Sequence, residues 1–185
     1  MQGKTTAQLR GSWHNFSKYR PLIRELVTRD LKVKYRRSFL GYVWSILNPL
    51  LMMLLQTLVF SYMFRFQIEN FPLYLICGNT LFNFFNESTN MGMGSVLGNS
   101  SLIKKVYVPK FIFPISRVVS SFVNLLFSLA AIILVMLITR SPFHLTILLV
   151  WAPLVLLFLF TCGIALLLSA LAVYFRDLQS LYGIV

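Results

Sequence analysis

The chain has 185 residues, of which 57% are hydrophobic and only 12% are charged, and its mean hydropathy is +0.74. A soluble domain of this length would be about one quarter charged, so this composition excludes an ordinary soluble protein. The net charge of +12 does not predict nucleic-acid binding, because most of the cations flank long apolar runs, as expected beside a membrane. We therefore expect an all-α fold, namely a polytopic membrane helical bundle with an amino-terminal amphipathic interface helix.

The amino-terminal part divides into a polar tail over residues 1–18 and a predicted amphipathic helix over residues 19–43. Apolar residues recur at three- and four-residue spacing between Tyr19 and Leu31, with basic residues around them. This pattern is typical of a helix in the membrane interface, and a solvated helix of a soluble tail is the alternative. The cations that we expect to contact lipid head groups are Arg29, Lys32, Lys34, Arg36 and Arg37.

Residues 44–185 form one predicted transmembrane domain. Apolar segments predict spans over about 44–64, 72–91, 115–138 and 145–172, and a fifth span begins at about 178. The chain stops at "LQSLYGIV", inside the expected fifth span, so we expect a further membrane portion to be missing.

The positive-inside rule predicts the orientation of these spans. Ten of the seventeen Lys and Arg residues precede Trp44, whereas Arg65 and Arg140 alone fall in the opposite loops. The amino terminus and residues 92–114 are therefore expected in the cytoplasm. The glycines at 92, 94 and 98 predict a bend after the second span, and Arg117 is expected to reach toward the interface.

The second predicted span carries a polar stripe. Asn79, Asn83, Asn86 and Asn90 share one helix face, and Glu87 borders it. Amides and a carboxylate facing lipid would be unfavourable, so the stripe must face protein or water. It is either a wall of a hydrophilic translocation path or a set of hydrogen bonds between packed helices, and the sequence leaves both interpretations open.

The sequence contains no pattern typical of a catalytic or metal-binding site. Gly3-Lys4-Thr5 matches the end of a phosphate-binding loop but lacks the glycine five residues earlier and the preceding strand. The two cysteines fall in apolar segments, and the two histidines have no nearby ligand partners. We expect this chain to bind no cofactor or metal. The energy for its activity should therefore come from a partner subunit or an ion gradient.

Three stretches together resemble a known family: "YRRSFLGYVWSILNPLLMMLLQTLVFSYMF", "NSSLIKKVYVPKFIFPISRVVSSFVN" and "YFRDL". They are similar to polysaccharide-exporting ABC permeases of the type-two class, which serve O-antigen, teichoic acid and capsular polysaccharide. The resemblance implies two permease copies paired with two ATPase subunits that bind ATP and magnesium, in the bacterial cytoplasmic membrane. It also implies that residues 92–114, which we call the coupling segment, touch the ATPase. The contact residues so implied are Asn99, Ser100, Ser101, Lys104, Lys105, Tyr107 and Pro109.

The function that we predict is export of a lipid-linked polysaccharide or teichoic acid through a channel between two permease copies. Arg36, Arg37 and the lysines are candidates to bind the diphosphate of the lipid carrier, although simple lipid anchoring also explains them. Two alternatives remain, an ion-coupled secondary transporter that uses Glu87 as its proton site and a non-transporting membrane scaffold.

Overall fold

The computed structural model describes residues 19–34, 41–64, 70–105, 108–139, 149–175 and 177–182. These ranges contain helices and no strand, so the all-α fold class is confirmed for them. After a first helix over residues 19–34, the elements are η1 (Gly41–Val43), α2 (Trp44–Phe64), α3 (Phe71–Met93), α4 (Ser95–Gly98), α5 (Ser100–Lys105), α6 (Ile112–Ile138), α7 (Trp151–Tyr174) and α8 (Leu178–Tyr182).

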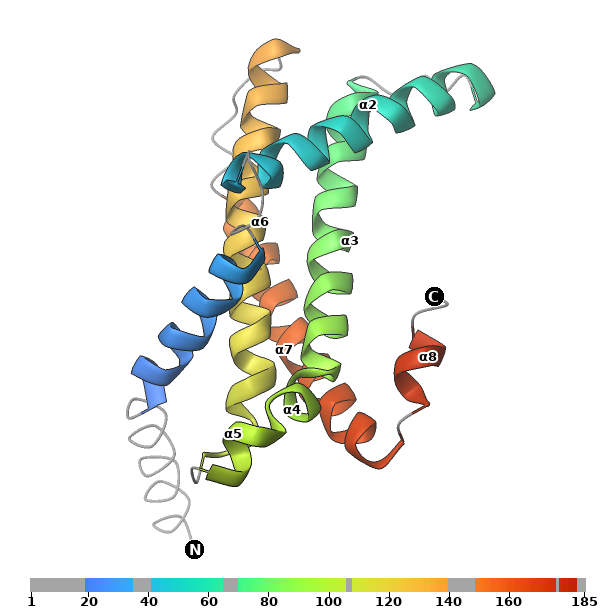
Figure 1. Ribbon diagram of the computed structural model, residues 1–185. Helices are drawn as coiled ribbons and strands as arrows, with labels where there is room; N and C mark the ends of the chain where they lie inside the picture. Colours follow the sequence, from blue (N-terminus) through green and yellow to red (C-terminus); the bar gives the residue numbers. More distant parts are fainter. Residues whose placement is uncertain are drawn as a thin grey trace, which may run out of the picture.

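The long helices α3, α6 and α7 form the body of the molecule, and the chain reverses direction from each to the next (Figure 1). Their shared core contains Phe84 of α3, Val118 and Leu125 of α6, and Leu154 and Ala165 of α7. The short helices α4 and α5 connect α3 to α6 at one end of this body (Figure 1). The described part of the coupling segment is therefore largely helical.

Helix α2 has the bounds expected of the first span, but it runs across the other helices. Its Met53 packs with Ile76 near the start of α3 and with Ala131 and Val135 near the end of α6. Figure 1 shows α2 running across α6 and α3 at a steep angle. The length of an apolar segment predicts the length of a helix, but it does not determine the angle at which that helix crosses its neighbours.

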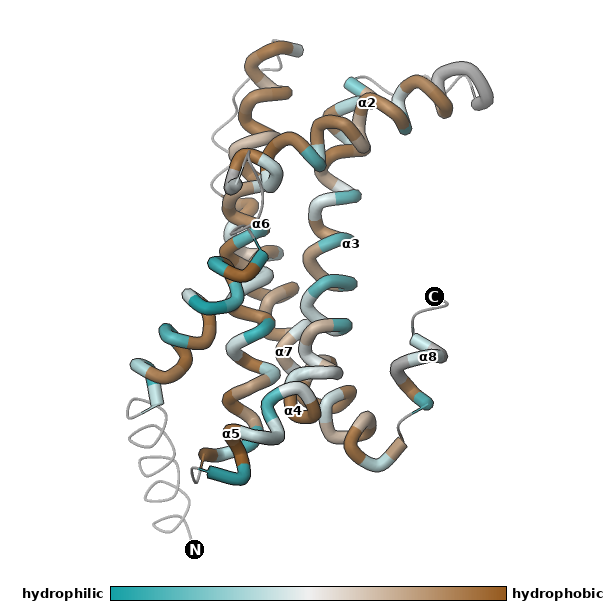
Figure 2. The backbone as a smooth tube through the Cα atoms, in the orientation of Figure 1, coloured by the Kyte–Doolittle hydropathy of each residue, from teal (hydrophilic) through white to brown (hydrophobic). Residues whose placement is uncertain are grey.

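Two helices in the described part, α6 and α7, are long and apolar enough to cross a membrane. Helix α3 occupies the expected second span, but its amides lower its hydropathy, and teal positions recur along it in Figure 2. The outer faces of α6 and α7 expose large apolar side chains, which is favourable in lipid and unfavourable in water. Examples are Ile133, Leu137, Leu156, Leu159 and Phe160.

The starts of α6 and α7 differ from the sequence prediction by several residues. Helix α6 starts at Ile112, so Pro114 belongs to its first turn, where proline is tolerated, and it is fully buried. Helix α7 starts at Trp151, and residues 145–148 of the expected fourth span lie outside the described residues. Helix α8 starts where the fifth span was expected, and the Tyr182 hydroxyl lies 2.7 Å from Thr89 Oγ1 of α3.

The glycines of the coupling segment have different structural roles. Gly94 separates α3 from α4, so the chain turns there as expected. Gly92 instead lies within α3 and faces α7, where an added Cβ would be 2.8 Å from Cβ of Ala165. It permits close helix packing and is not a hinge, which corrects its interpretation as part of the bend.

Candidate functional site

A polar cleft of about 610 Å³ opens between helix 19–34, α2, α3 and α6. Most of its polar lining consists of neutral amides and hydroxyls. These include Asn48 of α2, Asn83, Asn86 and Asn90 of α3, and Asn124 and Ser128 of α6. The polar stripe predicted on the second span therefore contributes three of its four asparagines to one cleft, together with Glu87.

Asn79 is the exception among the four asparagines. Its side-chain amide donates a hydrogen bond to the side-chain oxygen of Gln56 in α2, and it is not part of the cleft lining. Asn79 thus joins two packed helices, whereas Asn83 is exposed to the cleft. The interhelical hydrogen-bond interpretation fits Asn79, and Asn83 stays a candidate for the translocation path, because α2 covers the start of α3 and leaves the rest of that face open.

Asn86 and Asn90 lie one turn apart on the cleft wall and bind each other. The Nδ2 atom of Asn90 donates to Oδ1 of Asn86 at 2.7 Å and to its backbone oxygen at 2.9 Å. Both residues are exposed. The pair presents a preformed amide surface to the cleft, since the contact fixes the orientation of the Asn90 amide.

Lys34 and Glu87 form an ion pair in the cleft. Lys34 Nζ lies 2.6 Å from Glu87 Oε1, and Asn124 Nδ2 donates to the same oxygen at 3.2 Å. The side chains of Lys34 and Glu87 are 41% and 31% exposed, so water and salt partly screen the pair. Lys34 was predicted to contact lipid head groups. In the structure it reaches inward and connects helix 19–34 to α3.

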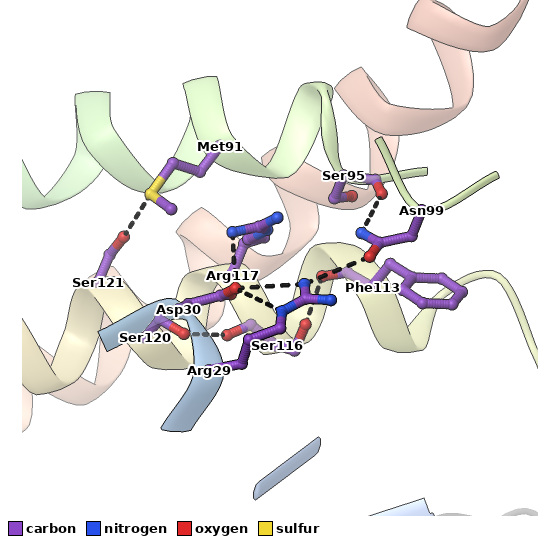
Figure 3. Close-up of polar contacts among 10 residues, drawn as sticks. All are labelled: Arg29, Asp30, Met91, Ser95, Asn99, Phe113, Ser116, Arg117, Ser120 and Ser121. Carbon is purple, nitrogen blue, oxygen red and sulfur yellow. Dashed lines mark hydrogen bonds and ion pairs between the residues drawn. The ribbon is translucent and has the colours of Figure 1, made fainter. Parts of the chain in front are cut away.

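A second charged group, the ionic cluster, comprises Arg29, Asp30, Asn99 and Arg117 (Figure 3). Asp30 Oδ1 lies 2.9 Å from Arg117 Nη1 and 3.3 Å from Arg29 Nη2. Arg29 Nη2 also donates to Oδ1 of Asn99 at 3.3 Å, and Asn99 Nδ2 donates to the backbone oxygen of Ser95 at 2.8 Å. The cluster therefore joins helix 19–34 to both α6 and the coupling segment.

The ionic cluster corrects the sequence prediction for Arg117 and adds protein contacts to Arg29, whose contact with lipid head groups stays a prediction. Arg117 is paired with Asp30 and its side chain is only 22% exposed, so it does not extend to the interface. Arg29, predicted as a head-group contact, is half exposed and its guanidinium is directed at Asp30 and Asn99. Lys32 is exposed as expected, while Arg36 and Arg37 lie outside the described residues.

Asp30 is the residue of this cluster that the sequence analysis missed. Its side chain is only 5% exposed. The available signal was its position four residues after Leu26 and three after Val27, which places Asp30 on the apolar face of the helix. A carboxylate on a buried face must be paired. Its main partner, Arg117, is remote in the sequence, so the pairing itself had no local pattern.

The residues predicted to contact an ATPase are distributed unevenly. Ser100, Ser101, Lys104 and Lys105 are exposed on α5, and Pro109 is partly buried. Asn99 is only 7% exposed, and its side chain holds the segment to Ser95 and Arg29. Tyr107 lies outside the described residues.

The apolar face of helix 19–34 contacts protein. Its Leu26 is 5% exposed and packs with the fully buried Ile112 and Phe113 at the start of α6. Leu102 and Ile103 of α5 pack against the same cluster. The sequence placed this helix in the membrane interface. The structure shows that its apolar stripe is also used to hold α5 and α6.

The cleft offers hydrogen bonds and few charges. Glu87 and Lys34 are its acidic and basic residues among the described lining, and they bind each other. Within the described ranges, no three His, Cys, Asp or Glu side chains gather in one place. An amide-lined cleft inside an apolar helical bundle is the kind of site that membrane transport proteins provide for polar solutes.

Comparison with known proteins agrees with this class. The family model described as "ABC-2 type transporter" matches residues 21–185, and the chain belongs to this family. The resemblance drawn from the sequence motifs is thereby confirmed. A permease subunit of this family is a transport component and is not itself a catalyst.

Several relatives share the family with this chain. The O-antigen export system permease protein RfbA of Myxococcus xanthus is 36% identical over 165 residues, which cover 87% of this chain and 62% of the relative. Its namesake in Klebsiella pneumoniae is 32% identical over 83% of this chain and 60% of the relative. The polysialic acid transport protein KpsM of Escherichia coli is 27% identical over 88% and 64%. The chain thus spans less than two thirds of the length of these relatives.

Proposed function

We propose that the chain belongs to the membrane subunit of an ATP-driven exporter that moves a polysaccharide across the bacterial cytoplasmic membrane. The observation that carries this proposal is the amide-lined cleft, which lies within an apolar bundle of an ABC-2 family chain. The names of the relatives, O-antigen export permease and polysialic acid transport protein, support a carbohydrate polymer as the cargo. The amino terminus and the coupling segment would face the cytoplasm.

The proposed energy source is a separate ATPase subunit that binds ATP and magnesium. Its docking surface would include Ser100, Ser101, Lys104 and Lys105, which are exposed side by side on α5. A second copy of the permease would complete the channel, and a lipid-linked polysaccharide would be the substrate. These partners follow from the resemblance, and the exposure of α5 supports the first of them.

Helix 19–34 provides a physical route from the coupling segment to the cleft. Arg29 and Asp30 bind Asn99 and Arg117, and Lys34 binds Glu87 one helical turn later. A displacement of the coupling segment by the ATPase would act on the ionic cluster. Because a helix moves as a rigid element, the same displacement would change the position of Lys34 in the cleft.

The diphosphate of a lipid carrier would meet the cations near the start of the chain. Lys34 already binds Glu87, so the remaining candidates are Lys32, which is exposed, and Arg36 and Arg37. Arginine suits this role because its planar fork binds phosphate oxygens in pairs.

The decisive experiment purifies the full-length permease and asks whether an ATPase subunit accompanies it. In vesicles that contain both, we expect polysaccharide transport to require ATP hydrolysis and to persist when the proton gradient is dissipated. If no ATPase co-purifies and transport follows the proton gradient, the ion-coupled alternative centred on Glu87 replaces this proposal. If neither ATP nor a gradient drives transport, the chain is a scaffold.

A further inference from the structure

We infer that the polar cleft accepts an uncharged, hydroxyl-rich stretch of polymer and disfavours an anionic one, and that Glu87 sets this selectivity by neutralising Lys34. The inference rests on the proposed export function and adds to it the charge class of the cargo. It also assigns Glu87 a role in specificity, in place of the proton transfer that the ion-coupled alternative gives it.

The geometry at Glu87 carries the first step. One carboxylate oxygen accepts both the 2.6 Å contact from Lys34 Nζ and the 3.2 Å hydrogen bond from Asn124 Nδ2. Lys34 belongs to helix 19–34 and Asn124 to α6, so groups from two other elements converge on this carboxylate of α3. The described lining therefore carries one positive and one negative charge in direct contact, and its net charge is zero.

The remaining lining fits sugar hydroxyls. An asparagine side chain offers both donors and an acceptor, so Asn83 and Asn48 can bind hydroxyl groups in more than one orientation. The Ser128 hydroxyl donates to backbone oxygens of Ser45 and Asn124 and can accept from a sugar hydroxyl. Trp44 lines the same cleft and is 43% exposed, which offers a flat apolar surface for the C–H face of a sugar ring. Such contacts require no charge on the polymer.

An anionic polymer would meet a less favourable cleft. Its carboxylates or phosphates would lose part of their hydration on entry, and the Lys34 ammonium that could compensate them is held by Glu87. An anion close to Lys34 would also be close to Glu87 and would be repelled by it. Removing the Glu87 charge should therefore release Lys34 and convert a neutral cleft into a cationic one.

The test uses the full-length permease with its ATPase partner in lipid nanodiscs and two probes, an uncharged dextran oligosaccharide and a sialic acid oligomer of similar length. Binding is followed by the fluorescence of Trp44, which lines the cleft, and a Trp44→Phe variant identifies its signal. We expect the wild type to bind the dextran probe with an affinity insensitive to salt, and to bind the sialic acid probe more weakly.

Glu87→Gln should raise affinity for the sialic acid probe by about fivefold, a value limited by the partial exposure of the pair. This gain should decrease as sodium chloride is added, and the substitution should raise the ratio of sialic acid affinity to dextran affinity. The double variant Lys34→Gln/Glu87→Gln, which is again neutral, should lose the gain. Glu25→Gln is the matched control, because it removes one negative charge from an exposed site on helix 19–34 outside the cleft lining.

Two failures can be distinguished. If ATP-dependent export persists but the wild type prefers the anionic probe, binds neither probe, or shows no change in preference on Glu87→Gln, the inference is wrong and the proposed function stands. If ATP-dependent export of any polysaccharide is absent from vesicles that contain both subunits, the proposed function fails, and the inference fails with it.

Discussion

The Oδ1 atom of Asp30 lies 2.9 Å from Nη1 of Arg117, which connects helix 19–34 to the first part of α6. Arg29 adds a second cation to the same oxygen at 3.3 Å, while Oδ2 of Asp30 is buried without a hydrogen-bond partner among the described residues. A buried carboxylate with one bare oxygen depends strongly on its ionic partners. The position of helix 19–34 should therefore depend on this pair.

We expect Asp30→Asn to destabilise the protein by about 1–3 kcal/mol, because it leaves two partly buried arginines without their counter-charge. A double-mutant cycle with Arg117→Gln, measured by reversible unfolding in mixed micelles, should give a favourable coupling energy. The double variant should be less destabilised than the sum of the single variants.

Glu25→Gln is the control for this cycle, since Glu25 is exposed on the same helix. It should change the free energy of unfolding by less than about 0.5 kcal/mol. A coupling energy near zero between Asp30 and Arg117 would contradict a stabilising role for this ion pair.

The sequence predicted the helices better than the contacts between them. Apolar length was sufficient to predict the bounds of α2, and the spacing of the asparagines was sufficient to predict the polar face of α3. The partners of that face were not predictable, because Lys34 and Glu87 are 53 residues apart, and Arg29 and Asn99 are 70 apart. Local periodicity carries no information on such pairs, so Lys34 was assigned to lipid and Asp30 received no role.

The same limit applies to Asn79 and Asn83. They are equivalent in a helical pattern, but α2 covers the first and leaves the second exposed in the cleft. The steep crossing of α2 produces this difference, and the crossing depends on how Met53 packs against α3 and α6. Tertiary packing thus decides which polar residue is structural.

Gly92 provides a second prediction. A Cβ at this position would be 2.8 Å from Cβ of Ala165, closer than real Cβ atoms approach each other. We expect the steric clash in Gly92→Ala to destabilise the contact between α3 and α7 by about 1–3 kcal/mol. The better helix propensity of alanine should offset up to about 1 kcal/mol of this loss. Thermal unfolding in detergent would measure the change.

Gly78 is a matched control, because it lies in the same helix and an added Cβ there would meet nothing within 4 Å. Gly78→Ala should leave stability unchanged or raise it by up to about 1 kcal/mol. Ala165→Gly should suppress part of the Gly92→Ala defect, since it removes the opposing methyl group. Equal effects at positions 92 and 78 would contradict the close packing of α3 and α7.

The two kinds of asparagine in α3 should respond differently to substitution. Asn79→Leu leaves the Gln56 oxygen without its donor and should destabilise the protein by about 0.5–2 kcal/mol. The double variant Asn79→Leu/Gln56→Leu should recover part of this loss, because both polar groups are then removed. Unfolding measurements on the three variants would test the contact.

Asn83→Ala should affect transport and leave stability nearly unchanged. Its side chain is exposed in the cleft, so stability should change by less than about 0.5 kcal/mol. ATP-dependent export in vesicles should nevertheless slow, and Asn83→Gln should retain more activity because it keeps the amide. Normal export by Asn83→Ala would remove this residue from the translocation path.

The exposure of Lys104 allows a direct test of orientation. Lys104 lies on α5 and is exposed. The positive-inside rule predicts that it faces the cytoplasm. Cys77 and Cys162 are replaced by alanine first, because both are free thiols. A Lys104→Cys variant in this background should react with a membrane-impermeant maleimide in inside-out vesicles and should not react in intact cells stripped of their outer layers.

Arg140→Cys supplies the opposite control, since position 140 follows Thr139 at the other end of α6. It should react from the outside and not in inside-out vesicles. When the ATPase subunit is bound, the reaction at Lys104→Cys should slow and that at Arg140→Cys should not, because only α5 would be covered. Reaction of Lys104→Cys from the outside would invert the whole topology, and unaltered reaction in the complex would move the ATPase contact away from α5.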